Sequence, residues 1–564
     1  MRRITPWRIG LTALALVAIV TAGPVTSAQA QNAPEIKLVL QITVDGLRGD
    51  LIERYRAGFG EKGFNRLLKE GAVFTNVHYQ HANTETIVGH ATLATGAHPA
   101  QHGLIGNVWF DDETKELAYN IEDAKAPLLP TREEANEGEQ VDPAQKLSRT
   151  KGRSPMALLA PTLGDTLSAY YAGKSKVFGV SGKDRSAVAM AGKVGKAFWY
   201  STDNGDFVTS KYYYDDYPSW ASDWNQERKA ESYAGANWAL SGKPASYLLY
   251  EQDDRAYEVD LKGYGRTFPH QFGEAGNPLL YTQLLVSPVG DELLLDFAKE
   301  LMRHEELGQD AVPDYFSISF SGVDAINHFF GPSSLENEEV MRRLDATLAE
   351  LLTFVDKQVG LEHALIVLSA DHGMADMAEY MSELGYEAGR LTPAEVTTVA
   401  NKAGENFGID EVTRLFYRPY LYLDEEKITE AGQKKRRVEK AIAKAISDIN
   451  GVEAAIATHR LEKGASGPLI DMVRNNHHPS RSGDIYVAQQ PYWFLFDEGP
   501  VAAMHGSPWR YDTHVPLIFV APDLKAQTIA RPAHPTDVAP TLAAYLGITA
   551  PASAQGTVLQ EVAK

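Results

Sequence analysis

The run Ala364-Leu365-Ile366-Val367-Leu368-Ser369-Ala370-Asp371-His372-Gly373 decides the fold, because a continuous apolar strand ends there in an acid and an imidazole. Apolar runs without polar alternation indicate strands that are covered on both faces of a sheet. Two further segments repeat the arrangement: Ile36–Val44 leads to Asp45, and Tyr315–Phe320 leads to Asp324 and His328. Parallel strands present polar residues together at their carboxyl ends. Three such endings suggest a two-metal centre.

The rest of the chain predicts a doubly wound α/β fold with a mostly parallel central sheet and helices on both faces. Further strands are expected at Lys176–Val180 and Leu517–Val520, and apolar residues recur at helical spacing from Val340 to Val355. Two regions interrupt this rhythm, the aromatic-rich range 197–285 and the range 375–485. We expect both to be insertions that cap the carboxyl edge of the sheet, with the aromatic residues forming a small separate core.

Residues 1–30 have the layout of a secretory signal peptide. Arg2, Arg3 and Arg8 precede an apolar stretch, and Ala28-Gln29-Ala30 provides a small-residue cleavage site. The stretch is too short to span a bilayer, and no later segment approaches the length that a spanning helix needs. We therefore expect residues 31–564 to be one catalytic domain with insertions, exported to the periplasm or secreted, without a membrane span.

Charge and cysteine content exclude several classes of partner and chemistry. The 564-residue chain has a formal net charge of −20, and its first 30 residues hold no acidic residue, so the exported part is more acidic still. Such a surface disfavours a nucleic-acid duplex or an anionic membrane as partner. The chain has no cysteine, which excludes disulfides, a thiol nucleophile and thiolate metal ligands. We expect a monomer, with a linker-like segment at Asp123–Lys151 that is rich in Ala, Pro and Glu.

Six residues are candidate metal ligands: Asp45, Asp324, His328, Asp371, His372 and His505. Asp324 and His328 are four residues apart, which places them on one face if a helical turn follows the strand. Each of the six alone would more often be a turn or structural residue, but together they are hard to explain without metal. Mixed carboxylate and imidazole ligation without thiolate suits zinc, with other borderline divalent ions as alternatives.

A hydroxyl nucleophile is expected in the segment Asn83-Thr84-Glu85-Thr86-Ile87-Val88-Gly89-His90. It follows a strand-like run and opens a helical stretch, and a hydroxyl in such a place is usually only a helix cap. A metal at the same strand ends could instead lower the pKa of this hydroxyl and activate it. Local chemistry leaves both Thr84 and Thr86 as candidates.

Seven ordered motifs resemble the alkaline phosphatase superfamily, specifically its exported bacterial branch with a threonine nucleophile, a branch related to the nucleotide pyrophosphatase/phosphodiesterases. The motifs are Val-Asp-Gly, Thr-x-x-Gly-His, Gly-Asn, Lys-Asp-Arg, Gly-x-Asp-x-x-x-His, Ala-Asp-His-Gly and Met-His-Gly. The resemblance implies that Thr86 is the nucleophile and that two Zn²⁺ are bound. It assigns one zinc to Asp324, His328 and His505, the other to Asp45, Asp371, His372 and Thr86, and the phosphoryl oxygens to Asn107, Lys183 and Arg185.

The residues themselves support a positively charged phosphoryl pocket. Lys183 and Arg185 follow an apolar strand, and in an acidic chain a phosphate dianion needs such local positive charge. The expected function is an alkaline phosphatase that hydrolyses small phosphate monoesters through a phosphothreonine intermediate. The alternatives are a nucleotide pyrophosphatase/phosphodiesterase and, more distantly, a non-catalytic phosphate-binding protein of the envelope. His90 and His102 are expected to orient loops by hydrogen bonds rather than bind metal.

Overall fold

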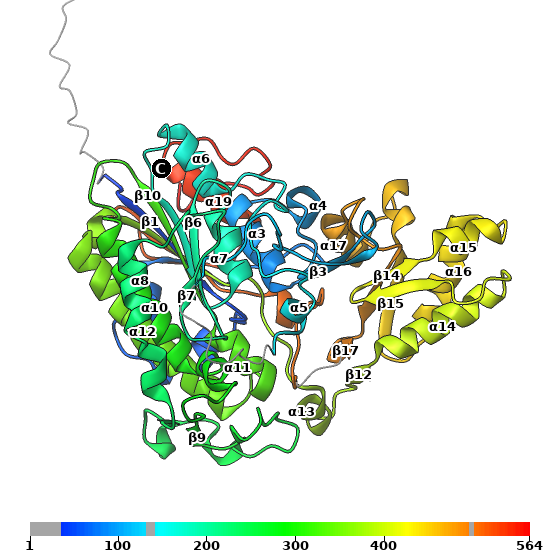
Figure 1. Ribbon diagram of the computed structural model, residues 1–564, viewed down its shortest axis with the longest axis horizontal. Helices are drawn as coiled ribbons and strands as arrows, with labels where there is room; N and C mark the ends of the chain where they lie inside the picture. Colours follow the sequence, from blue (N-terminus) through cyan, green and yellow to red (C-terminus); the bar gives the residue numbers. More distant parts are fainter. Residues whose placement is uncertain (1–34, 131–140, 496–500, 564) are drawn as a thin grey trace, which may run out of the picture.

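The structure is a computed structural model that describes residues 35–130, 141–495 and 501–563, so the expected signal peptide lies outside the described residues. A nine-stranded sheet runs through the centre of the molecule (Figure 1). Its strands, in spatial order, are β19 (Gln527–Ile529), β2 (Ala72–Phe74), β18 (Leu517–Val520), β11 (Ala364–Ser369), β1 (Leu38–Val44), β10 (Asp314–Phe320), β5 (Val177–Ser181), β6 (Lys196–Tyr200) and β7 (Phe207–Val208).

The five middle strands, from β11 to β6, are parallel, whereas β18 and β7 join the sheet antiparallel. Every residue of β1, β10 and β11 is buried, as their apolar sequences predicted. Thr43 of β1 aligns with Ser319 of β10 and with Ser369 of β11. These three neighbouring strands therefore end level with one another, and the residues that follow them meet at one edge.

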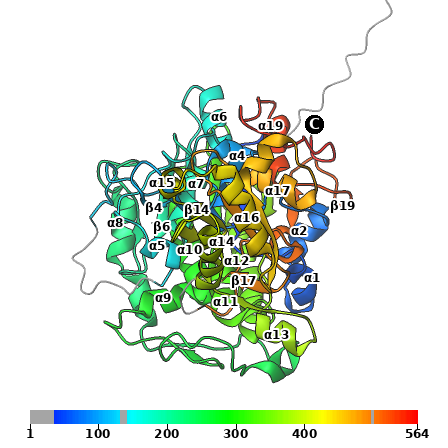
Figure 2. The ribbon, with the colours of Figure 1, turned by 90° about the vertical axis from the view of Figure 1, so that its right-hand side faces the viewer.

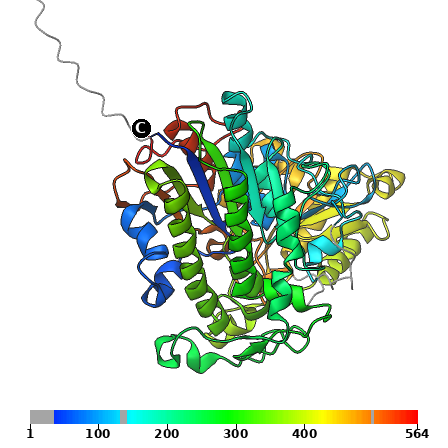
Figure 3. The same ribbon diagram turned by 60° about the vertical axis from the view of Figure 1, so that its left-hand side comes forward.

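Helices cover both faces of the sheet, which confirms the doubly wound α/β prediction. One layer contains α10 (Pro288–His304), α12 (Leu335–Gln358), α8 (Ser219–Gln226), α1 (Leu51–Tyr55) and α2 (Phe64–Glu70), and Figure 3 shows the green α10 and α12 lying across the strands. The other contains α3 (Thr86–Thr95), α7 (Asp184–Ala191), α6 (Leu163–Tyr170) and α19 (Val538–Tyr545). Helix α11 (Gly322–Phe330) begins directly after β10.

The range 197–285 begins inside the central sheet, because β6 and β7 occupy its start. The rings of Phe198, Trp220 and Trp224 lie 5.3, 5.2 and 5.4 Å from that of Phe297 in α10. All four belong to the same hydrophobic core as the sheet. The prediction of a separate aromatic core is thus wrong, because α10 lies directly beneath these rings. Further elements in this range are β8 (Asn237–Trp238), β9 (His270–Gln271) and α9 (Leu280–Leu285).

Residues within and just beyond 375–485 form a second sheet with its own hydrophobic core. Its strands, in spatial order, are β13 (Thr413–Tyr417), β14 (Tyr420–Leu423), β16 (Ile485–Gln489) and β15 (Val452–Ala457). Its helices are α14 (Pro393–Glu405), α15 (Glu425–Glu430), α16 (Lys435–Ser447) and α17 (Pro468–Asn476), and β12 (Gly389–Leu391) pairs with β17 (Trp493–Leu495) beside it. Figure 1 shows this lobe extending from one side of the central sheet, and in Figure 2 the lobe faces the viewer.

Short elements connect the sheet and the lobe. They are the hairpin of β3 (Val108–Asp111) and β4 (Glu116–Tyr119), α4 (Pro99–His102), α5 (Pro143–Lys146), α13 (Ala378–Glu383) and α18 (Arg510–Thr513). None of the helices in the described ranges is long and apolar enough to cross a membrane.

Candidate active site

The expected metal ligands converge at the carboxyl ends of the three central strands. Asp45 follows β1, Asp371 and His372 follow β11, and Asp324 lies in the first turn of α11 after β10. The side chains of all four are fully buried. Gly46, next to Asp45, has a φ of +71°, and a Cβ there would lie 2.9 Å from the Cβ of Asp324. Glycine at this position therefore lets the end of β1 and the start of α11, after β10, approach each other.

The six ligands form two groups of three, Asp324 with His328 and His505, and Asp45 with Asp371 and His372. Within each group the potential ligand atoms all lie within 4.8 Å of one another. His328 Nε2 lies 3.4 Å from Asp324 Oδ2, and His372 Nε2 lies 3.3 Å from Asp45 Oδ1. Ligands at zinc bond lengths in a tetrahedron are about 3.3 Å apart. The spacing in both groups fits a tetrahedral divalent ion.

The three imidazoles are oriented by backbone carbonyls. Nδ1 of His328 lies 2.9 Å from Ala503 O, Nδ1 of His505 lies 2.8 Å from Thr84 O, and Nδ1 of His372 lies 2.7 Å from Gly373 O. A carbonyl can only accept, so each Nδ1 carries a proton, and Nε2 is the atom left to bind a metal in the neutral ring. This arrangement is the one that metal-binding histidines use, because it fixes both the tautomer and the ring.

Several polar atoms in these two groups are buried without a hydrogen-bond partner among the described residues. They are Oδ1 of Asp45, Oδ1 of Asp324 and Nε2 of His372, whereas Oδ2 of Asp45 lies 2.9 Å from Lys183 Nζ and Oδ2 of Asp371 lies 3.1 Å from His90 Nδ1. A buried carboxylate oxygen without a partner is costly unless a cation binds it. The two oxygens of Asp371 have different roles. Its Oδ1 accepts from Gly46 N and His372 N, while its Oδ2 faces the site. The donor set therefore fits two divalent metal ions.

The electrostatics of the site also favour bound cations. Burial lowers the pKa of His372, but the carboxylates of Asp371 and Asp45 raise it to about 10. Burial and the charge of Asp324 raise the pKa of Asp45, but Lys183 and His372 outweigh them and lower it to about 2. Lys183 Nζ lies 2.9 Å from Asp45 Oδ2 and also contacts Asp324 Oδ2. Asp45 thus stays ionised, whereas burial and the charge of Asp45 raise the pKa of Asp371, and a bound cation would offset that repulsion.

The two candidate threonines occupy different environments. Thr84 Oγ1 donates to Ser507 O at 2.9 Å, so this hydroxyl is used in tying two loops together. Thr86 is the first residue of α3, and its Oγ1 accepts from Arg185 Nη2 at 3.5 Å. Both are fully buried, but only Thr86 has its hydroxyl next to an expected phosphate-binding residue.

Helix α3 is held against the metal ligands by Gly89 and His90. A Cβ at Gly89 would lie 2.0 Å from Asp371 O, so only glycine allows this approach. His90 Nδ1 lies 2.8 Å from Thr86 O and 3.1 Å from Asp371 Oδ2, and its Nε2 lies 2.8 Å from Ser319 Oγ. The prediction that His90 orients loops by hydrogen bonds is confirmed. It links Thr86 to the end of β11.

Two of the three expected phosphoryl contacts, Asn107 and Arg185, lie beside Thr86, whereas Lys183 contacts Asp45 and Asp324. Ile87 N donates to Asn107 Oδ1 at 3.2 Å, which turns the Nδ2 group of Asn107 away from the backbone of α3. Lys183 and Arg185 flank the first residue of α7, and their side chains are 10% and 5% exposed. Arg185 Nη1 donates to Asp142 Oδ2 at 2.6 Å. Asp142 could not be identified from the sequence, because it lies in the segment expected to be a linker.

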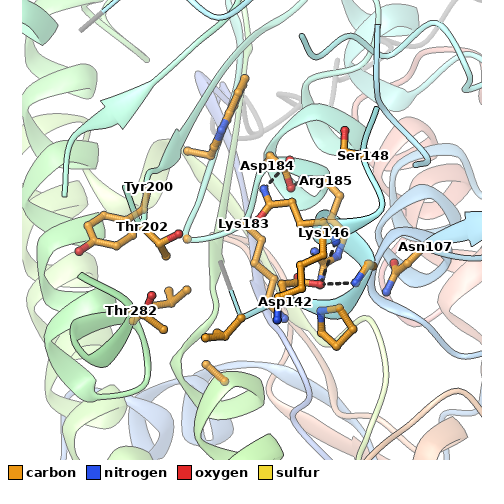
Figure 4. A pocket seen from close by; sticks show the side chains of 18 of the residues that line it. Asn107, Asp142, Lys146, Ser148, Lys183, Asp184, Arg185, Tyr200, Thr202 and Thr282 are labelled. Carbon is orange, nitrogen blue, oxygen red and sulfur yellow. Dashed lines mark hydrogen bonds and ion pairs between the residues drawn. The ribbon is translucent and has the colours of Figure 1, made fainter. Parts of the chain in front are cut away.

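A cavity of about 430 Å³ opens onto this arrangement (Figure 4). His328, His505 and Asp324 lie on its wall, together with Asn107, Lys183 and Arg185. Other parts of the wall come from residues around α5 and from the carboxyl end of β6, and Figure 4 shows Asp142, Lys146 and Tyr200 among them. The volume is that of a pocket for a small organic ligand.

Comparison with known proteins places these residues in a family. The family described as type I phosphodiesterase / nucleotide pyrophosphatase matches residues 39–508. The chain is 30% identical over 531 residues to a protein of Myroides odoratus named calcium-transporting ATPase, covering 93% of this chain and 94% of that protein. It is 30% identical over 558 residues to alkaline phosphatase PafA of Elizabethkingia meningoseptica, covering 97% and 98%.

Solved structures show the same relationship. The crystal structure of wild-type PafA matches with a TM-score of 0.85 at 28% identity, covering 94% of this chain and 99% of that one. A PafA variant substituted at a threonine, an asparagine, a lysine and an arginine matches with the same TM-score, identity and coverage. The chain therefore belongs to the type I phosphodiesterase / nucleotide pyrophosphatase family and is a phosphoric ester hydrolase similar to alkaline phosphatases.

Proposed function

We propose that this protein is a zinc-dependent alkaline phosphatase that hydrolyses phosphate monoesters through a phosphothreonine at Thr86. The observation that carries the proposal is the meeting of two buried Asp/His groups with one hydroxyl and two cationic side chains at a single strand edge. The names of the PafA relatives support a phosphatase. The expected signal sequence supports action outside the cytoplasm.

Zinc is the proposed metal because half of the six ligands are imidazoles and the chain has no thiolate. We assign Asp324, His328 and His505 to one ion and Asp45, Asp371 and His372, with Thr86 Oγ, to the other. When bound, the two ions would lower the pKa of the attacking hydroxyl and stabilise charge on the attacking and departing oxygens.

The protein's own residues position the reacting groups. Thr86 Oγ stands at the amino end of α3, where the helix dipole favours negative charge, and attacks phosphorus as the bond to the departing ester oxygen breaks. Nη2 of Arg185 and Nδ2 of Asn107 are placed to donate to the equatorial phosphoryl oxygens. Water then cleaves the phosphothreonine and releases inorganic phosphate.

Charge favours a monoester over a diester. Two zinc ions carry about +4, three aspartates with a threonine alkoxide about −4, Lys183 with Arg185 about +2, and Asp142, which pairs with Arg185, about −1. The site is then positive overall and attracts a monoester, with a charge of about −2, more strongly than a diester, with about −1. The second candidate is a nucleotide pyrophosphatase/phosphodiesterase, which the description of the matching family favours.

The test compares an aryl phosphate with its methyl diester on zinc-loaded protein. We expect kcat/KM to favour the monoester strongly. The double variant Lys183→Ala, Arg185→Ala should lose orders of magnitude on the monoester, because each charge-assisted hydrogen bond contributes roughly 1.5–3 kcal/mol. The loss of kcat/KM on the diester should be smaller, so the ratio of kcat/KM for the monoester to that for the diester should fall. Equal losses on both substrates, or a wild-type preference for the diester, would favour the phosphodiesterase.

A further inference from the structure

The guanidinium of Arg185 is presented to the active site by one edge only. Its Nη1 donates to Asp142 Oδ2 at 2.6 Å, whereas its Nη2 lies 3.5 Å from Thr86 Oγ1. Its Nε is buried and has no hydrogen-bond partner among the described residues. Nε and Nη2 lie along one edge of the planar group, and such an edge grips two oxygens of a single anion. That edge faces Thr86, and Asp142 holds the opposite end.

Asp142 is itself fixed in place. It is the N-cap of α5, and its Oδ1 accepts from Ala144 N at 2.9 Å and from Gln145 N at 3.3 Å. One carboxylate oxygen is thus committed to the helix and the other to Arg185. Burial would raise the pKa of Asp142, but Arg185 and Lys183 outweigh it and lower the pKa below its usual value. The carboxylate is therefore ionised at any pH at which a phosphatase of this kind would work.

The same segment holds the backbone beside Arg185. The carboxylate of Asp184 accepts from Gln145 Nε2 at 2.9 Å, from Arg153 Nε at 2.7 Å and from the hydroxyl of Tyr119 at 2.7 Å. Gln145 belongs to the region Asp123–Lys151 that composition suggested was linker-like, and Arg153 lies just beyond it. Residues 141–153 thus form a wall of the site. This wall contacts Arg185 and also Asp184, the residue between Lys183 and Arg185.

We propose that Asp142 is a positioning residue for phosphoryl recognition, which holds Arg185 so that its Nε and Nη2 donate together to two equatorial oxygens. The inference rests on the proposed phosphoryl-transfer site. Without the carboxylate at Nη1, the guanidinium can rotate about its long side chain and offer a single donor instead of a fork. Two parallel hydrogen bonds then become one, and the extra anionic oxygen of a monoester loses its partner.

The test variant is Asp142→Asn, and the chain offers a matched control in Asp424→Asn. Asp424 also caps a helix, since its Oδ1 accepts from Lys427 N, and it also pairs with an arginine, Arg414, at 3.2 Å. Its side chain is 18% exposed and that of Asp142 is 23% exposed. Both variants neutralise a helix-capping carboxylate that pairs with an arginine, one at the active site and one in the lobe. Asp142→Ser, which keeps a capping oxygen, serves as a second variant if the first is unstable.

Three quantities should separate positioning from stability in zinc-loaded protein. Asp142→Asn should weaken binding of inorganic phosphate, measured by titration calorimetry, by about 10- to 100-fold. It should lower kcat/KM for an aryl phosphate by a similar factor and for the methyl diester by much less. Zinc content and the thermal midpoint should match those of Asp424→Asn, which should leave phosphate binding and turnover unchanged.

Equal losses on monoester and diester, or phosphate binding as tight as in the wild type, would overturn the inference. Its failure can be told apart from failure of the proposed function. If the wild type turned over no monoester, the phosphatase proposal would fall, while the phosphate titrations of wild type and Asp142→Asn would still decide whether Asp142 positions Arg185.

Discussion

Two groups of buried acidic residues in this molecule behave in opposite ways. At the active site, burial raises the pKa of Asp45, yet cationic and imidazole neighbours lower it to about 2. The second group consists of Glu258 and Glu336. Burial raises the pKa of Glu258 to about 9 and raises the pKa of Glu336 well above its usual value. Both groups have carboxylate oxygens without hydrogen-bond partners among the described residues. Burial of acids alone therefore does not distinguish a metal site.

The difference lies in what surrounds the carboxylates. Asp45 faces Lys183 and the free Nε2 of His372. Glu336 Oε1 has one imidazole, His270, at 3.1 Å, and burial lowers the pKa of that ring to about 4, so it carries no charge at neutral pH. The glutamates keep a proton, whereas the aspartates need a cation. Converging ligand atoms, rather than acidity, make the first group a candidate metal site.

The largest effect should follow removal of one acid from each group. Asp371→Asn takes a charged ligand from one metal group, so we expect loss of about one zinc per chain and of nearly all turnover of an aryl phosphate. Glu336→Gln replaces an acid that is already neutral, so zinc content and turnover should stay close to wild type. Metal analysis after dialysis measures the first quantity. Zinc loss from Glu336→Gln would remove the distinction between the two groups.

The next effect tests the hydroxyl of Thr86, which lies beside the two Asp/His groups and has no counterpart in the comparison with Glu258 and Glu336. Thr86→Ala should lower turnover at least about 10³-fold, and Thr86→Ser should retain a measurable fraction because a hydroxyl remains. Thr84→Ala is the matched control, since the Thr84 hydroxyl donates to Ser507 O, and its effect on turnover should be small. An inactive Thr84→Ala with an active Thr86→Ala would assign the nucleophile to the other threonine.

The smallest effect concerns the glutamate pair and pH. A carboxyl that holds its proton in the folded state up to about pH 9, but ionises near its usual value of 4.5 when unfolded, stabilises the fold most at low pH. That stability falls as pH rises toward 9, by at most about 1.4 kcal/mol per pH unit for one proton. The glutamine in Glu258→Gln cannot ionise, so this variant should lose less folding stability over the same rise in pH.

Thermal midpoints of wild type and Glu258→Gln between pH 6 and 9 measure this difference. The wild-type value should fall relative to that of the variant by a few degrees across the range, while zinc content stays equal in both. Parallel curves would mean that the pair is ionised in the folded protein, as Asp45 is.

Much of the metal region could be predicted from the sequence because its residues follow strands. Strand β11 is apolar and every one of its residues is buried. Its sequence alone therefore predicts that Asp371 and His372 lie at its carboxyl end. Three such strands in parallel register bring their ends together, so the candidate ligands could be named without coordinates. The exclusion of thiolate chemistry likewise needed only the absence of cysteine.

Other features depended on contacts between distant parts of the chain. Thr84 and Thr86 are indistinguishable locally, and only the position of Ser507 and Arg185 separates their hydroxyls. The aromatic residues after β6 have no pattern that reveals α10 beneath them, and so the separate core was predicted wrongly. Such placements arise from packing among elements that are far apart in sequence.

The sequence by itself determined the α/β class and the ligand types at the strand ends, because hydrophobic burial dictates where strands lie and strands dictate where their last residues point. Only the tertiary structure decided which acids meet imidazoles and which meet each other. It also placed Asp142, from a segment with the composition of a linker, against Arg185. Composition reports how well a segment tolerates solvent, whereas an ion pair 43 residues apart in sequence forms only when the fold brings its partners together.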